Sequence, residues 1–195
     1  MGEPVNTVVP DVLQDLLRDE LRVVLCGTAA GTTSAAARAY YAHQQNKFWK
    51  VLHATGLTPE QLQPHQFRDL LQYRIGLTDL VKAEAGMDRS VLPKLTAEDR
   101  NRLRQSIMNF RPGFLAFTSK TAGQKYFGGK RDLGEQAERI GDTRIWILPS
   151  TSGAANGSWR PEVWYRFAEE VRGSAGRRKV GVVPANAGTH SQRPR

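Results

Sequence analysis

The stretch LRVVLCGTAAGTTS, residues 21–34, contains the strongest fold signal in this chain of 195 residues. Its first half, from Leu21 to Gly27, is a short apolar run that ends in glycine, which is typical of a buried strand. Its second half passes through Gly27 and Gly31 into small polar residues that are compatible with the start of a helix. A buried strand that leads into a helix is the unit from which α/β folds are built.

Helix and strand signals alternate on both sides of this stretch. The spacing of apolar residues predicts an opening helix over 12–20. Further along, the patterns predict helices over 46–55 and 96–110. A third helix is expected to start at Thr58, in a Thr-Pro-Glu-Gln capping sequence, and to run towards Tyr73. Strands are predicted over 77–81, 113–119 and 143–149. We therefore expect an α/β fold with three layers, α/β/α, in which a short, mostly parallel central sheet lies between helices.

Charge is distributed unevenly along the chain. The 28 Lys and Arg residues and 19 Asp and Glu residues give a net charge of +9, and residues 172–195 contribute six basic residues and no acid. We expect one domain over 1–171 and a basic, disordered tail over 172–195. The tail is either a salt-sensitive DNA tether that does not read sequence or a solvated extension without a role.

Composition excludes several classes of protein. A hydrophobic fraction of 39% is that of a folded chain. No apolar run approaches the roughly 20 residues that span a bilayer, and the N-terminus lacks a signal-peptide pattern. We expect a cytoplasmic protein, nucleoid-associated in a bacterium, without a membrane partner. The single cysteine, Cys26, excludes an internal disulfide, and with only four histidines we expect no metal site.

Glycines follow the first predicted strand at the place where parallel sheets bind ligands, beyond the carboxyl ends of the strands. Gly27 and Gly31 are four residues apart, which does not fit the dinucleotide pattern G-x-G-x-x-G, and no lysine occurs before Lys47 to complete a P-loop. Backbone N–H groups of residues 28–32 are suited to attract negative charge. The loop is equally compatible with a turn that needs glycine only for its geometry.

Four segments in order resemble one known family. LRVVLCGTAAGTTS (21–34), AHQQNKFWKVL (42–52), LLQYRIGLTDLV (70–81) and RIWILPSTSG (144–153) resemble the mismatch-specific uracil-DNA and thymine-DNA glycosylase branch of the uracil-DNA glycosylase superfamily, over roughly residues 20–170. The resemblance implies an α/β/α enzyme that flips uracil out of DNA and hydrolyses its N-glycosidic bond without metal or cofactor. It implies a monomeric, monofunctional enzyme of base excision repair, whose partner is DNA containing uracil or abasic sites.

The resemblance also assigns residues to the base pocket. Tyr41 matches the aromatic residue that stacks on the flipped base, although it could equally be a core tyrosine. Asn46 matches an asparagine whose amide suits the O4 and N3–H edge of uracil, although it could instead cap the following helix. The pocket is also expected to include Gly27, Thr28, Ala29, Ala30 and Gly31.

The first family motif is altered in this chain. The family has Gly-x-Asn-Pro-Gly, and its asparagine holds the attacking water, whereas this chain has Ala29 and Ala30 at the Asn and Pro positions. Alanine has no group that can hold water. We therefore expect the water to be held by Thr33, Ser34 or Asp79.

The second motif and the loop that wedges into the duplex also depart from the family. Asn-Pro-Ser is replaced by Ser150-Thr151-Ser152, and the large apolar residue expected early in the wedge loop is replaced by Ala154. The residues expected to contact DNA are Lys120, Ser150, Thr151, Ser152, Gly153, Asn156, Trp159 and Arg160.

Alternatives to uracil excision remain open from the sequence. Loss of the water-holding asparagine favours a non-catalytic protein that captures uracil or abasic sites in DNA. Removal of hypoxanthine differs only in the width of the pocket. Binding of an unrelated nucleotide by the α/β domain is disfavoured by the agreement of the four segments.

Overall fold

The computed structural model describes residues 11–83 and 95–177. Its central sheet has the strand order β2-β1-β3-β5-β4. The strands are β1 (Val23–Gly27), β2 (Ile75–Asp79), β3 (Phe114–Phe117), β4 (Gly134–Ile140) and β5 (Thr143–Ile147). β1 pairs in parallel with β2 and β3, and β3 pairs in parallel with β5, whereas β4 runs antiparallel to β5. The predicted α/β fold with a mostly parallel sheet is confirmed.

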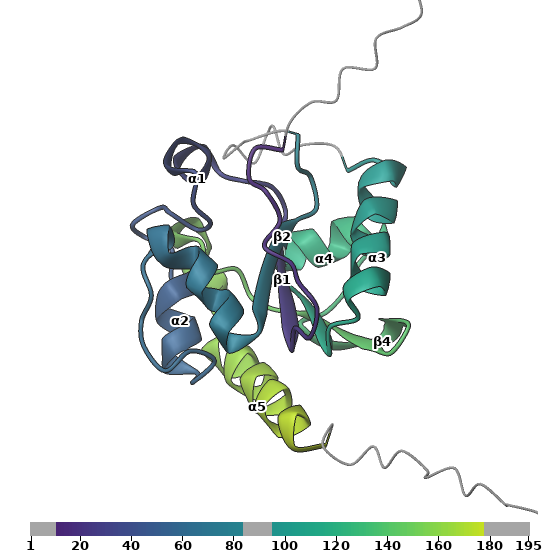
Figure 1. Cartoon of the computed structure of the whole chain (residues 1–195). Helices are drawn as coiled ribbons and strands as arrows, with labels where there is room; N and C mark the ends of the chain where they lie inside the picture. Colours follow the sequence, from purple (N-terminus) through teal and green to yellow (C-terminus); the bar gives the residue numbers. More distant parts are fainter. Residues whose placement is uncertain (1–10, 84–94, 178–195) are drawn as a thin grey trace, which may run out of the picture.

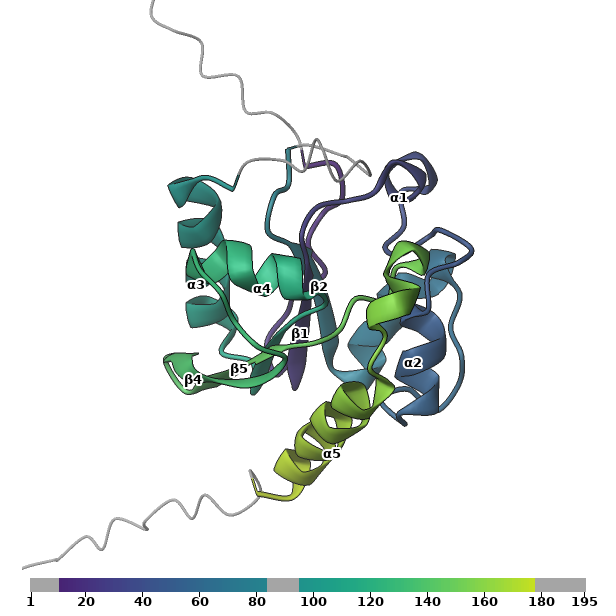
Figure 2. The same cartoon turned by 180° about the vertical axis from the view of Figure 1, so that it is seen from behind.

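Helices cover both faces of this sheet, with α2 and α5 on one side and α3 and α4 on the other (Figures 1 and 2). The helical elements are α1 (Thr32–Ala37), α2 (Phe48–Ala54), η1 (Pro64–Tyr73), α3 (Ala97–Phe110), α4 (Lys120–Phe127), η3 (Gly153–Ser158) and α5 (Pro161–Arg177). None of the helices in the described part of the chain is long and apolar enough to cross a membrane.

The alternation of side chains along β1 builds two cores. Val23 and Leu25 belong to one hydrophobic cluster with Trp164 of α5, while Val24 and Cys26 belong to the other. Successive strand residues point to opposite faces of a sheet, so a strand that is apolar at every position must be covered on both sides. This explains why the continuous apolar run at 21–27 identified a central strand.

The predicted helix over 96–110 is confirmed as α3, and its start has a clear cause. The Thr96 hydroxyl accepts a hydrogen bond from the backbone N–H of Asp99 at 3.1 Å, and the Asp99 carboxylate accepts one from the backbone N–H of Thr96 at 2.9 Å. This reciprocal capping box satisfies two donors at the helix start.

The opening helix predicted over 12–20 is wrong. Residues 12–16, here called the edge segment, contain no helix and lie beside the outer edge of β2, where Leu16 exchanges backbone hydrogen bonds with Leu77 at 2.9 and 3.0 Å. β2 lies at the edge of the sheet, where its outer backbone groups need partners. Pairing with that edge outweighs the helical spacing of the apolar residues, and Leu13 and Leu16 are still buried.

Other boundaries also differ from the predictions. The helix predicted from Thr58 begins only at Pro64, because the Thr58 hydroxyl donates to the carbonyl of Glu60 at 2.8 Å and does not cap a helix. Residues 172–177 were expected in the tail but continue α5, where Arg172 donates to the carbonyl of Thr55. The rest of the predicted tail, 178–195, lies outside the described residues. β4 and α4 had not been predicted, and β4 has a mostly exposed, polar sequence.

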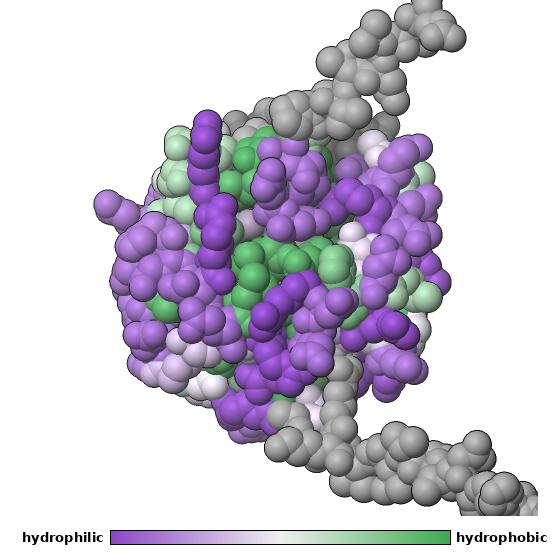
Figure 3. Space-filling view, in the orientation of Figure 1, coloured by the Kyte–Doolittle hydropathy of each residue, from purple (hydrophilic) through white to green (hydrophobic). Residues whose placement is uncertain are grey.

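The edge segment and β2 run through the middle of the view in Figure 1. Figure 3 shows hydrophobic residues along the middle of this face, with hydrophilic residues on either side. The close approach of the edge segment depends on Gly76 in β2. A Cβ atom at this position would lie 2.6 Å from Leu21 Cδ1 and 2.8 Å from the backbone oxygen of Leu16.

We predict that Gly76→Ala lowers the free energy of unfolding by about 1–3 kcal/mol, because the added methyl group collides with backbone that cannot move independently. Urea unfolding followed by circular dichroism measures the loss. Gly129→Ala is the matched control, since no heavy atom lies within 4 Å of a Cβ added there. Equal stability of the two variants would contradict the close packing of the edge segment on β2.

Candidate functional site

A pocket of about 340 Å³ opens at the carboxyl ends of the parallel strands. Its wall includes the ends of β1 and β2 at Gly27 and Asp79, Thr118 after β3, and Ser150 after β5. The remaining wall comes from the turn into α1, the segment between α1 and α2, and the start of η3. Ligands of parallel α/β sheets bind at this edge, where strand ends converge and helices begin.

Most of the sequence-predicted site residues meet in this pocket. They are Gly27, Thr28, Ala29, Ala30, Gly31, Thr33, Ser34, Tyr41, Asn46, Asp79, Ser150, Thr151, Ser152 and Gly153. The pocket is also lined by residues that were not predicted for it, namely Leu13, Tyr40, His43, Gln45, Thr118, Ser119 and Ala154. Thr118 and Ser119 are the last two residues of the strand predicted over 113–119, so the rule about carboxyl ends could have identified them. Leu13 gave no such signal, because its segment was expected to be helical.

Asp79 is buried at the end of β2, directly beside Gly27. The two residues are partners in the register of β1 and β2. A Cβ atom added to Gly27 would lie 2.2 Å from Asp79 Oδ1 and 3.4 Å from the Tyr41 hydroxyl. The glycine at the end of the first strand is therefore needed to make room for the carboxyl group, not only to form a turn.

Burial raises the pKa of Asp79 from an ordinary value of 3.8 to about 7. The positive charges of Lys82 and Arg102 oppose this increase, and the negative charge of Asp15 adds to it. A carboxyl group with a pKa near 7 can exchange a proton at neutral pH, which is the property required of a general base. Asp79 is thus suited to hold and deprotonate a water molecule in the pocket.

Tyr41 both packs in the core and lines the pocket. Its ring stacks on Phe48 with a centroid distance of 3.7 Å and an angle of 13° between the planes. Its hydroxyl shares a hydrogen bond of 3.0 Å with the hydroxyl of Thr118. The backbone at Tyr41 is left-handed, with φ of 52°, an uncommon conformation for a bulky residue. Packing and hydrogen bonding hold the aromatic ring in a fixed place at the pocket wall.

Asn46 contacts the start of α2 and also lines the pocket. Its side-chain oxygen accepts a hydrogen bond of 3.0 Å from the backbone N–H of Phe48, the first residue of α2. The same side chain lines the pocket. Since the oxygen is used by the helix, the amide NH₂ group is the part of Asn46 that can donate to a ligand.

The altered first motif contributes little polar chemistry from its side chains. Ala30 is buried in the hydrophobic core, and Ala29 is half-buried. Ser34 is buried, and its hydroxyl accepts a hydrogen bond from the backbone N–H of Ala42 at 3.1 Å, which fixes the chain after α1. Thr33 is exposed at the pocket edge. Among the three residues expected to hold water, Asp79 is the one that is both charged and buried.

Four residues expected to contact DNA lie outside the pocket wall. Lys120 begins α4 and forms an exposed ion pair of 3.4 Å with Asp132. Trp159 is half-buried and follows η3, and Lys47 Nζ lies 5.5 Å from the centre of its ring. The other two are Asn156, which accepts a hydrogen bond from Lys47, and Arg160, which is exposed. No group of three or more His, Cys, Asp or Glu among the described residues is placed to hold a metal ion.

Comparison with known proteins identifies a family and a fold. The model of the Uracil DNA glycosylase superfamily matches residues 14–168. The solution NMR structure of a "putative Uracil DNA glycosylase" from Methanosarcina acetivorans is similar, with a TM-score of 0.57 and 16% sequence identity over 84% of this chain and 98% of that chain. At this identity the structural likeness supports the fold alone. The mismatch-specific branch stays a prediction.

We predict that burial of the Asp79 carboxyl gives the protein a characteristic pH dependence of stability. The folded pKa is raised, so the contribution to stability is full below the unfolded pKa, near pH 4, and is lost as the pH rises through about 7. Asp79→Asn removes this titration. The unfolding free energy of the variant minus that of the wild type should increase between pH 4 and pH 8, by at most about 4 kcal/mol.

Urea unfolding at a series of pH values measures this difference. Asp132→Asn is the control for replacing an aspartate by asparagine at the surface, because the Asp132 carboxylate is fully exposed. A pH-independent difference for Asp79→Asn would show that its carboxyl is ionised as easily as one in water.

Proposed function

Because the chain belongs to the Uracil DNA glycosylase superfamily, we propose that it is a monofunctional uracil-DNA glycosylase of base excision repair, within the mismatch-specific branch. It acts as a monomer on DNA that contains uracil, flips the base into the pocket and leaves an abasic site, without a metal or cofactor. The observation that carries this proposal is the buried carboxyl of Asp79 at the pocket wall, with a pKa of about 7.

Asp79 supplies the chemistry that Ala29 cannot. Its carboxylate accepts a hydrogen bond from a water molecule and orients the water towards C1′ of the deoxyribose. As the bond between C1′ and uracil N1 breaks, its electron pair leaves with the base, the water oxygen bonds to C1′, and Asp79 takes the proton. The negative charge that develops on uracil is stabilised by backbone N–H groups of the turn over 28–31 and by the amide NH₂ group of Asn46.

A monofunctional reaction agrees with the side chains at the pocket. An enzyme that also cuts the DNA strand forms a Schiff base with the opened sugar, which requires an amine. No lysine occurs among the described residues that line the pocket. Water, activated by Asp79, is therefore the nucleophile, and the strand is left intact at the abasic site.

The test is excision of uracil from a labelled DNA duplex by the purified protein, followed by alkaline cleavage of abasic sites. We predict a cut product for the wild type, and a single-turnover rate about 10²–10⁴-fold lower for Asp79→Asn, the usual contribution of a general base. A parallel substrate with hypoxanthine in place of uracil decides between the two bases.

Gel-shift binding to abasic DNA separates the enzyme from a capture protein. The replacement of the family asparagine by Ala29 is the specific observation that favours capture. Retention of abasic or uracil DNA by the wild type without any cleavage would reject the glycosylase and support the capture function. Turnover that is unchanged in Asp79→Asn would reject Asp79 as the base.

We predict that Asn46→Asp separates helix capping from base recognition. The aspartate keeps an oxygen that accepts from the N–H of Phe48, so stability should change little, but it replaces the amide donor with an acceptor. Uracil excision should fall about 10–100-fold, as expected when a buried polar contact is lost. Asn46→Ala should lose both stability and activity. Equal activity of Asn46→Asp and the wild type would assign Asn46 to capping alone.

A further inference from the structure

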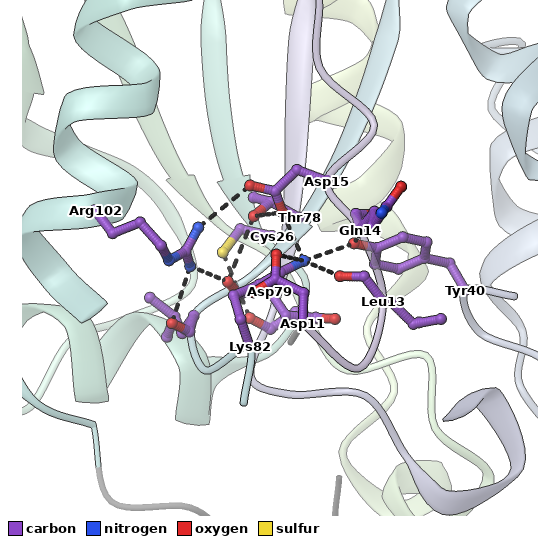
Figure 4. Close-up of polar contacts among 12 residues, drawn as sticks. Asp11, Leu13, Gln14, Asp15, Cys26, Tyr40, Thr78, Asp79, Lys82 and Arg102 are labelled. Carbon is purple, nitrogen blue, oxygen red and sulfur yellow. Dashed lines mark hydrogen bonds and ion pairs between the residues drawn. The ribbon is translucent and has the colours of Figure 1, made fainter. Parts of the chain in front are cut away.

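Lys82 does not line the pocket, but it forms hydrogen bonds with Leu13 and Tyr40, which do (Figure 4). Lys82 follows β2, three residues after Asp79, and its side chain is 5% exposed. Its ammonium group lies 2.7 Å from Asp15 Oδ1, donates to the Tyr40 hydroxyl at 3.3 Å and donates to the carbonyl of Leu13. Lysine is almost never buried to this extent unless its charge is paired, so the site is built around this group.

Asp15 joins Lys82 to the strand that ends in Asp79. Its Oδ1 accepts a hydrogen bond of 2.6 Å from the Thr78 hydroxyl, and its Oδ2 lies 3.3 Å from Arg102 Nη1. Arg102, on α3, also donates to the backbone carbonyl of Asp79 at 2.5 Å and to that of Leu80 at 3.1 Å. Arg102 therefore holds the backbone at Asp79 and Leu80, and Asp15, paired with Lys82, holds Thr78 next to it.

Lys82 also contacts two residues of the pocket wall. Leu13 and Tyr40, both bonded to Lys82, line the pocket. The Tyr40 hydroxyl donates to the backbone carbonyl of Gln14, so it links the edge segment to the chain between α1 and α2. Lys82 is therefore the point where the edge segment, the end of β2 and the pocket wall are held together.

We propose that Lys82 is a positioning residue for Asp79, which holds the edge segment against the end of β2 and, by its positive charge, keeps the neighbouring carboxyl available as a base at neutral pH. The inference rests on the proposed function, since it concerns the same carboxyl group. It adds to that function a residue that touches neither substrate nor water and that sets the pH at which the site operates.

The charged and titratable groups around Asp79 determine the direction of the effect. From the end of β2, Lys82 lowers the pKa of Asp79; from α3, Arg102 lowers it; and from the edge segment, Asp15 raises it. Burial raises the pKa of Cys26, Tyr40 and Tyr41, and the charge of Asp79 raises the pKa of each further, so these three groups stay neutral. If Lys82 is removed, burial and Asp15 still raise the pKa of Asp79, and only Arg102 still lowers it.

Two substitutions should move the titration of Asp79 in opposite directions. In Lys82→Met the midpoint should rise by about one pH unit or more, and in Asp15→Asn it should fall, as expected for loss of a nearby charge of either sign. Lys82→Arg keeps the charge and should restore a midpoint close to that of the wild type. General loss of packing cannot produce shifts of opposite sign, so the pair separates electrostatic positioning from a merely structural role.

The experiment measures the midpoint in two ways on the full chain. The ¹³C NMR signal of the Asp79 carboxyl, assigned by its absence in Asp79→Asn, is titrated in the protein without DNA. The single-turnover rate of uracil excision is measured over pH 5 to 9. For Lys82→Met we expect about a tenfold lower rate at pH 7, with recovery towards the wild-type rate at pH 9. Lys130→Met, at an exposed lysine outside the cluster, is the control and should follow the wild type.

Each outcome decides the inference. The same midpoint in Lys82→Met and the wild type, with a loss of rate at every pH, would overturn it, and so would a rise of the midpoint in Asp15→Asn. If Lys82→Met does not fold, Asp15→Asn and Lys82→Arg still give the two comparisons. If the wild type excises no uracil, the proposed function fails, while the NMR midpoints still decide whether Lys82 controls Asp79.

Discussion

The burial of one carboxyl group, that of Asp79, is the constraint on which this end of the structure depends. Removing a carboxylate from water is costly, and here it is tolerated because Lys82 and Arg102 place positive charge nearby. Gly27 provides the space, since any side chain there would collide with Asp79 Oδ1. The last residues of β1 and β2 therefore depend on each other: Gly27 has no side chain, and this leaves room for the carboxyl group of Asp79.

Stability and the candidate site share the same residues. The edge segment pairs with the backbone of Leu77 in β2 and also brings Leu13 to the pocket and Asp15 to Lys82. An edge strand that is covered in this way is protected from pairing with other chains. Asp79, at the end of the same strand, is buried, and this burial raises the pKa of its carboxyl.

The altered family motif has a physical counterpart in the pocket. In the turn after β1, Ala29 and Ala30 have only methyl side chains, so the turn has no polar side chain at these positions, and Ala30 is buried in the core. The polar group that the motif lacks is present at the end of the adjacent strand, at Asp79. Under the proposed function, the water is held from β2 rather than from the turn, by a carboxylate that can take a proton as well as orient the water. A carboxamide at the usual place could only orient it.

The sequence by itself determined the central strands, helix α3 and most of the pocket residues, from Gly27 to Ser152. The strands and α3 were predicted from apolar runs and helical spacing, and the pocket from the rule that parallel strands bring their carboxyl ends to one edge, together with the resemblance to the glycosylase family. The tertiary structure alone decided that the edge segment pairs with β2 at Leu16, that η1 begins only at Pro64, and that Lys82 is buried. The spacing of Leu13 and Leu16 fits one face of a helix, and nothing in it indicates pairing with β2. The deciding partners, Leu77 and Lys82, lie more than sixty residues away in the chain, where local periodicity carries no information.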